Sequence, residues 1–161
     1  MKILLAVASL SGNTRDVARL VSARCAEHGL ALDWIETDMQ TLADAPAPPS
    51  RYDLFMLGTW TDNGGRTPSE MKRFIIDMVN LVGKPSHVAV FGTGETQWGE
   101  EYYCGAVHRI AQFFASPFPV LTIEQMPHGV SDANIIATWT DQVLAHCQHS
   151  PQDANHYSHL A

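Results

Sequence analysis

Residues 9–14 are of types that bind anions. The segment consists of Ser9, Leu10, Ser11, Gly12, Asn13 and Thr14. An apolar run precedes it and apolar residues at helical spacing follow it, so it joins a strand to the N-terminus of a helix. Unpaired backbone N–H groups, the positive end of the helix dipole and the hydroxyl groups together favour an anion at such a junction.

The kind of anion follows from what this loop lacks. The spacing GxxxxGK[ST] of nucleotide triphosphatases is absent, and no lysine directly follows Gly12. A single phosphate monoester held by neutral donors is therefore the predicted ligand. The alternative is a loop without a ligand, in which Ser11 or Asn13 caps the helix.

Two tryptophans, Trp60 and Trp98, lie in the glycine-rich segments 58–65 and 92–99. A core tryptophan normally sits within a strand or on a helix face, whereas a ring in such loops has little protein to pack against. A flat ligand would supply the missing surface. Either ring alone could equally be a lid on ordinary core, but the pair beside an anion loop favours an aromatic cofactor.

The rest of the chain predicts the elements that position these loops. Five apolar segments are predicted strands: 2–8, 30–36, 52–58, 87–91 and 119–123. Helices are predicted over 15–27, from residue 68, over 100–114 and over 131–146, the last capped by Ser131 or Asp132. This alternation predicts an α/β fold, a three-layer sandwich around a five-stranded parallel sheet of order 2-1-3-4-5. The loops after strands one, three and four then meet where such folds bind ligands.

Composition narrows the class of protein. The 161 residues are 45% apolar and carry a formal net charge of −7, which suits one globular domain and argues against binding to nucleic acid or to an acidic membrane surface. We expect the domain to span 1–147 and a polar, flexible tail to span 148–161. His146 and His149 could contact a metal, but no ligand set of recognisable spacing surrounds them, so no metal site is predicted.

The cysteines and the N-terminus indicate the compartment. Cys25, Cys104 and Cys147 form no CxxC pair, so we expect no disulfide framework and a reducing environment. The chain shows neither a signal peptide nor a run long enough to span a membrane. A cytoplasmic protein is therefore expected.

Three segments together resemble the flavodoxin family. Segment 9–14 is similar to the phosphate loop [ST]-x-[ST]-G-x-T of that family, and Thr59 with Trp60 is similar to its [ST]-W. Segments 91–95 and 101–107 resemble its signature FG[ST]GD...YxYFCGAV. The resemblance implies a flavodoxin-like fold, FMN as cofactor and a low-potential, one-electron carrier rather than an enzyme. Because the insertion in strand five is lacking, the chain resembles the short-chain members.

The resemblance also implies a cofactor site, with Trp60 on the inner face of the flavin ring and 93–98 around its other face and pyrimidine edge. The implied cofactor-binding residues are Ser9, Leu10, Ser11, Gly12, Asn13, Thr14, Thr59, Trp60, Thr61, Asp62, Asn63, Gly64, Gly92, Thr93, Gly94, Glu95, Gln97, Trp98, Tyr102, Tyr103 and Cys104. No residue is assigned a catalytic role, and Cys104 is interpreted as a packing residue rather than a nucleophile.

Some positions depart from the family pattern. Where the family usually has a tyrosine over the outer flavin face, this chain has Trp98, so the outer ring could be Trp98 or Tyr102. Thr61 stands where many members have glycine, and Glu95 stands where they have aspartate. These differences concern the redox details and leave the expected cofactor unchanged.

Two other functions remain open at this stage. Gly64 with Gly65, and the run 98–100, are similar to features of the flavodoxin-like activator of a manganese ribonucleotide reductase. An FMN-dependent NAD(P)H or quinone reductase is the second alternative, although the short loops offer little room for a substrate.

The expected partners follow from the charge. The acidic residues Asp62, Glu95, Glu100 and Glu101 lie in the two ring-binding loops. We therefore expect a monomer that meets a basic reductase or acceptor.

Overall fold

The computed structural model describes residues 1–148. Its five strands are β1 (Ile3–Ala8), β2 (Leu32–Glu36), β3 (Leu54–Thr59), β4 (Val88–Gly94) and β5 (Leu121–Glu124). They form one sheet in the order β2-β1-β3-β4-β5, and every neighbouring pair is parallel. The predicted fold class and strand order are therefore confirmed.

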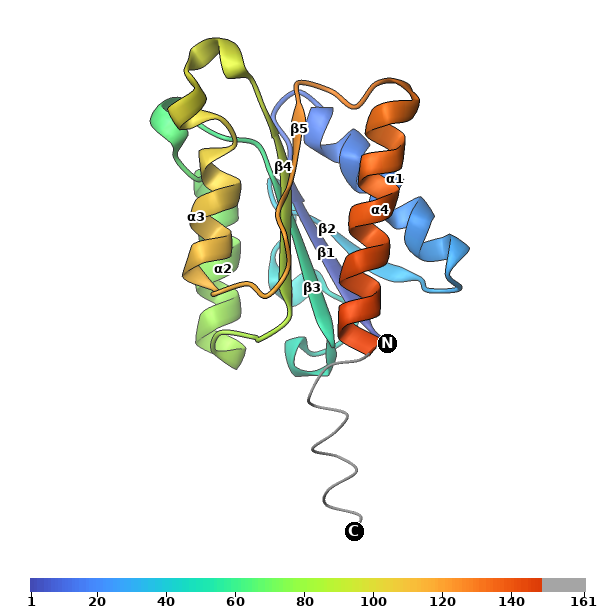
Figure 1. Ribbon diagram of the computed structural model, residues 1–161. Coiled ribbons are helices and arrows are strands. Elements are labelled where there is room, and N and C mark those ends of the chain that lie inside the picture. The colour runs from blue at the N-terminus through green and yellow to red at the C-terminus, as the bar shows by residue number, and fades with distance from the viewer. Residues whose placement is uncertain (149–161) are drawn as a thin grey trace.

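Helices cover both faces of the sheet, as Figure 1 shows. Helices α1 (Asn13–Glu27) and α4 (Gly129–Gln148) lie on one face, and α2 (Ser69–Val82) and α3 (Gly105–Phe113) lie on the other. Side chains of β1, β3 and β4 point alternately to the two faces and are almost all buried. Each face therefore has its own apolar cluster, and the central strands hold the loops at their carboxyl ends rigidly.

Several predicted boundaries are wrong, and each error has a local cause. Strand β4 continues to Gly94, so Gly92 and Thr93 belong to the strand and not to the loop after it. Helix α3 begins at Gly105 rather than at residue 100, because Cys104 has a φ of 49° and so breaks the helical path. Residues 100–102 form a separate 3₁₀ turn.

The last helix also begins before its predicted cap. It starts at Gly129, and the carboxylate of Asp132 accepts a hydrogen bond from the backbone N–H of His128 at 3.0 Å. The predicted tail 148–161 lies outside the described residues except for Gln148, which ends α4. His149 also lies outside them, whereas the ring of His146 packs against Phe118, with centroids 5.0 Å apart. Within 1–148, no helix is long and apolar enough to cross a membrane.

Candidate functional site

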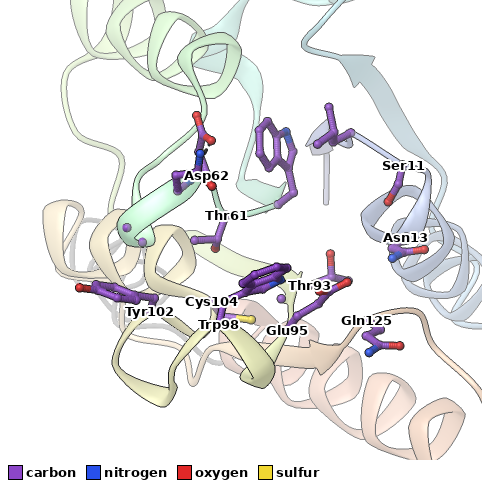
Figure 2. A pocket seen from close by; sticks show the side chains of 16 residues that line it. Ser11, Asn13, Thr61, Asp62, Thr93, Glu95, Trp98, Tyr102, Cys104 and Gln125 are labelled. Carbon is purple, nitrogen blue, oxygen red and sulfur yellow. Dashed lines mark hydrogen bonds between the residues drawn. The ribbon is translucent and has the colours of Figure 1, made fainter.

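One cavity of about 510 Å³ opens at the carboxyl edge of the sheet, where the loops after β1, β3 and β4 meet. Figure 2 shows Ser11 and Asn13 on one side of this hollow, Thr61 and Asp62 on another and Trp98 facing it from the turn after β4. The cavity is lined by Leu10, Ser11, Asn13, Trp60, Thr61, Asp62, Asn63, Gly64, Gly65, Thr93, Gly94, Glu95, Trp98, Tyr102, Cys104 and Gln125. The three loops predicted to be neighbours are thus brought together.

The loop after β1 turns sharply into α1. Gly12 occupies the N-cap position with a φ of 97°, in the left-handed region that suits glycine. The hydroxyl of Ser9 accepts hydrogen bonds from the backbone N–H of Gly12 at 3.1 Å and of Arg15 at 3.3 Å. The alternative in which Ser11 or Asn13 caps the helix is therefore wrong, because Gly12 occupies the N-cap position. Both side chains line the cavity instead, without a hydrogen bond to any described residue.

Thr14 ties this loop to the end of β4. Its side chain is buried, and its Oγ1 lies 2.8 Å from Oγ1 of Thr93. Thr93 lines the cavity, whereas Thr14 does not. This hydroxyl pair joins the first turn of α1 to the end of β4, 79 residues apart in the chain, and so holds these two parts of the site together.

Trp60 is built into the core as well as into the cavity. It packs against the apolar cluster on the α2 and α3 face, contrary to the expectation that this loop gives a ring little protein to contact. Its indole Nε1–H donates to Oε1 of Glu70 at 3.0 Å. The hydroxyl of Thr59 donates to the carbonyl of Trp60 at 2.7 Å, so side chain and backbone are both held.

The rest of the loop after β3 closes on itself and docks on α3. The N–H of Asp62 donates to the carbonyl of Arg66 at 2.8 Å. Gly65 and Gly105 approach so closely that a Cβ on Gly105 would lie 2.8 Å from Cα of Gly65. The hydroxyl of Thr61 accepts from the N–H of Ala106 at 3.3 Å, where the start of α3 lacks an intrahelical partner.

Trp98 stands on a surface turn. It is 72% exposed, and its Nε1–H donates to Oε2 of Glu95 at 2.7 Å. The same carboxylate oxygen accepts from the side-chain amide of Gln97. Glu124, at the end of β5, anchors this turn by accepting from the N–H of Thr96 at 3.0 Å. The side of the cavity that Trp98 forms is therefore held by polar contacts rather than by core packing.

Cys104 forms part of the cavity wall but is chemically inert. The residue is fully buried, and burial raises the pKa of its thiol to about 12. Burial also raises the pKa of the neighbouring Tyr103 phenol to about 12. Both groups are protonated near neutral pH, which supports a packing role for Cys104 because a nucleophile needs a thiolate.

Some implied site residues do not line the cavity. They are Ser9, Gly12, Thr14, Thr59, Gly92, Gln97 and Tyr103, which shape the loops or lie behind the lining. Sequence reasoning missed Gly65 and Gln125. Gly65 could have been found from the sequence, because it forms a double glycine with the implied Gly64. Gln125 could not, because the loop 125–128 after the edge strand β5 contains no serine, threonine, glycine, tryptophan, tyrosine or phenylalanine.

Comparison with known proteins gives one consistent result. The family model described as "Flavodoxin domain" matches residues 4–159. The chain is 31% identical over 144 residues to "Probable flavodoxin 2" of Bacillus subtilis, which covers 84% of this chain and 89% of that protein.

Solved structures agree with this result. The structure of oxidised Flavodoxin 2 from Bacillus cereus is 28% identical and superposes with a TM-score of 0.74 over 90% of this chain and 99% of that chain. Oxidised Flavodoxin 1 from the same organism is 23% identical and shares the fold, with a TM-score of 0.75 over 91% of this chain and 99% of that chain.

These matches do not favour an activator of a manganese ribonucleotide reductase or a reductase enzyme. Members of the matching family use FMN as cofactor and are electron carriers rather than enzymes. By its sequence, its strand order and its relatives, the chain belongs to the flavodoxin family and is a short-chain member of it.

Proposed function

We propose that the cavity at the carboxyl edge of the sheet is the FMN site through which this flavodoxin carries electrons. The observation that supports this most strongly is that the neutral side chains of Ser11 and Asn13 and two indole rings border the same cavity. Its volume of about 510 Å³ is in the range of small-molecule sites. The residues present therefore fit a planar ring that carries a phosphate.

The loop 9–14 would hold the phosphate. Ser11 and Asn13 offer side chains that have no hydrogen-bond partner among residues 1–148, and the first N–H groups of α1 have none within the helix. The guanidinium of Arg15 is directed to Glu36, with hydrogen bonds of 2.8 and 3.0 Å. Hydrogen bonds from neutral donors, rather than this cation, would therefore stabilise the phosphate.

The ring would lie between Trp60 and an outer aromatic residue. Trp98 suits the outer position because it lines the cavity and its indole is tethered to Glu95. Tyr102, which is 45% exposed, packs beside Gly65. The remaining contacts would come from Leu10, Thr61, Asp62, Asn63, Gly64, Thr93, Gly94, Glu95 and Cys104, with Ser9, Gly12, Thr14, Thr59, Gly92, Gln97 and Tyr103 supporting them.

Bound FMN supplies the one-electron chemistry, and the chain's own residues bind and orient it. Trp60 and the buried strand ends exclude water from one side of the site. Burial raises the pKa of the Cys104 thiol to about 12, so this thiol offers no nucleophile to the flavin at neutral pH.

The acidic rim suits a basic redox partner. Asp62 and Glu95 line the cavity, and Glu100 and Glu101 lie in the turn that contains the lining residue Tyr102; none of the four forms an ion pair with a lysine, arginine or histidine among residues 1–148. Unpaired surface charge of one sign attracts a partner of the other sign. We infer a monomer over 1–147 that meets a basic reductase or acceptor in the cytoplasm, where the unpaired Cys25, Cys104 and Cys147 would stay reduced.

Flavin identity and phosphate dependence test the proposal. Flavin released from the purified protein should be FMN, in a ratio of one per chain. The apoprotein should bind FMN at least about 100-fold more tightly than riboflavin, because only FMN carries the phosphate. Ser11→Ala should narrow this preference, whereas Ser22→Ala, further along α1, serves as the control. Bound FAD, or equal affinity for FMN and riboflavin, would contradict the proposal.

A further inference from the structure

Three tryptophans, one within β2 and two in the loops at the carboxyl edge of the sheet, share one feature, a hydrogen bond from the indole N–H to a carboxylate. Trp34 donates to Glu36 at 3.1 Å, Trp60 to Glu70 at 3.0 Å and Trp98 to Glu95 at 2.7 Å. Glu36 is also paired with Arg15. Within 1–148, by contrast, neither Glu70 nor Glu95 forms an ion pair with a basic side chain, so no cation competes with the indole N–H for these carboxylates.

Glu70 is well placed to hold an indole. It lies in the first turn of α2, where the helix dipole favours a negative charge, and Pro68 at the N-cap offers no side-chain cap. Its hydrogen bond to Trp60 joins the start of α2 to the loop after β3 across ten residues of sequence. A charge-assisted bond of this kind is stronger than one between neutral groups.

Among residues 1–148, this bond is the one hydrogen bond that the Trp60 side chain forms. The bond from Thr59 reaches the carbonyl of Trp60 and so fixes the backbone. The apolar cluster packs against the ring but does not favour one ring orientation by hydrogen bonding. The plane that Trp60 presents to the cavity is therefore set by this packing together with the hydrogen bond to Glu70.

We infer that Glu70 is a positioning residue of the cofactor site, which acts by fixing the plane of the Trp60 ring through its hydrogen bond. This inference rests on the proposed FMN site. Glu70 does not line the cavity, so it acts on the flavin through Trp60.

Two substitutions separate the hydrogen bond from the charge. Glu70→Leu removes both, whereas Glu70→Gln keeps an acceptor oxygen and removes the charge. Asp77→Asn is the matched control, because it removes a carboxylate seven residues further along the same helix, about 10 Å away. The measurements are the Nε1–H resonance of Trp60 in the apoprotein, assigned with Trp60→Phe, and the dissociation constant for FMN.

Glu70→Leu should move the Trp60 resonance and raise the dissociation constant about tenfold. Glu70→Gln should restore affinity to within about threefold of wild type, because an amide oxygen still accepts. Asp77→Asn should leave both measurements unchanged. An unmoved resonance in Glu70→Leu, or Glu70→Gln binding as weakly as Glu70→Leu, would overturn the inference.

The resonance also separates this inference from the proposed site. If wild-type apoprotein does not bind FMN, the proposed site is wrong, yet the resonance still reports whether Glu70 holds the indole. If wild type binds FMN and the resonance does not move in Glu70→Leu, the proposed site stands and the positioning role fails.

Discussion

Trp60 and Trp98 border the same cavity but belong to different kinds of structure. Trp60 follows a central strand and packs against the core that α2 and α3 share. Trp98 lies in a short turn, is 72% exposed and is tethered by the carboxylate of Glu95. One wall of the site is therefore formed when the chain folds, and the other rests on polar contacts at the surface.

Because of this difference, the two rings should contribute differently to the free energy of unfolding and to the affinity for the ligand. A ring packed in the core contributes to the free energy of unfolding whether or not a ligand is bound, because its burial does not depend on the ligand. An exposed ring gains its packing partner only from the ligand. Substitutions in the two walls should therefore give different ratios of lost stability to lost affinity.

The largest effect is expected for Trp60→Ala. Loss of a stacking face should weaken FMN binding about 100-fold, and loss of core packing should lower the free energy of unfolding of the apoprotein by about 2 kcal/mol. An FMN titration and urea denaturation measure the two quantities. A variant that loses affinity without losing stability would show that Trp60 is not part of the core.

A smaller and purely ligand-dependent effect is expected for Trp98→Ala. Affinity for FMN should fall about tenfold, because the outer face of the ring loses its cover. The free energy of unfolding of the apoprotein should change by less than about 0.5 kcal/mol, since the side chain is mostly exposed. Tyr102→Ala is the matched comparison. If it costs more affinity than Trp98→Ala, Tyr102 and not Trp98 covers the outer face.

Thr61→Ala probes the anchor of the inner wall. Without the hydroxyl, the N–H of Ala106 at the start of α3 loses its partner, which should cost about 1 kcal/mol of stability. Thr61→Ser retains the hydroxyl and should remain within about 0.5 kcal/mol of wild type. Equal urea midpoints for the two variants would show that this contact does not anchor the loop.

The smallest effect on FMN binding is expected for a substitution far from both walls, at the ion pair between α1 and α4. Hydrogen bonds from Arg24 hold the pKa of Asp141, which links α4 to α1, down at about 2. A carboxyl whose pKa is lowered by folding stabilises the protein above its ordinary pKa of about 4, and this contribution is lost as the pH falls towards 2.

Asp141→Asn should therefore lower the thermal midpoint by only a few degrees at pH 7, because the pair is partly exposed. The difference should shrink towards zero as the pH falls below about 2, where Asp141 becomes protonated. FMN affinity at pH 7 should not change. A change in affinity would mean that the α1 and α4 side is coupled to the cavity.

The sequence was sufficient for the fold because each central strand is an apolar run between polar loops. Buried parallel strands such as β1 and β3 need no other signal. The helix boundaries were less predictable. Nothing in the sequence shows that Cys104 takes a left-handed conformation, and that conformation delays α3 to Gly105.

Site residues were predictable where residue type carried the signal. Hydroxyl groups and glycines located the loops, and parallel topology brought these loops together. Contacts between separate elements were not predictable, since Glu70 reaches Trp60 only once α2 packs beside the loop. Gln125 lines the cavity only because β5 pairs with β4, and its own residue type carries no signal.

The most direct test of the central claim, an FMN-based electron carrier, is a spectroelectrochemical titration of the FMN-loaded protein. Potential is lowered stepwise while flavin absorbance is recorded. Two separate one-electron steps, both reversible and both obtained without an added substrate, are the predicted result. A single two-electron step, or a protein that holds no FMN, would contradict the account.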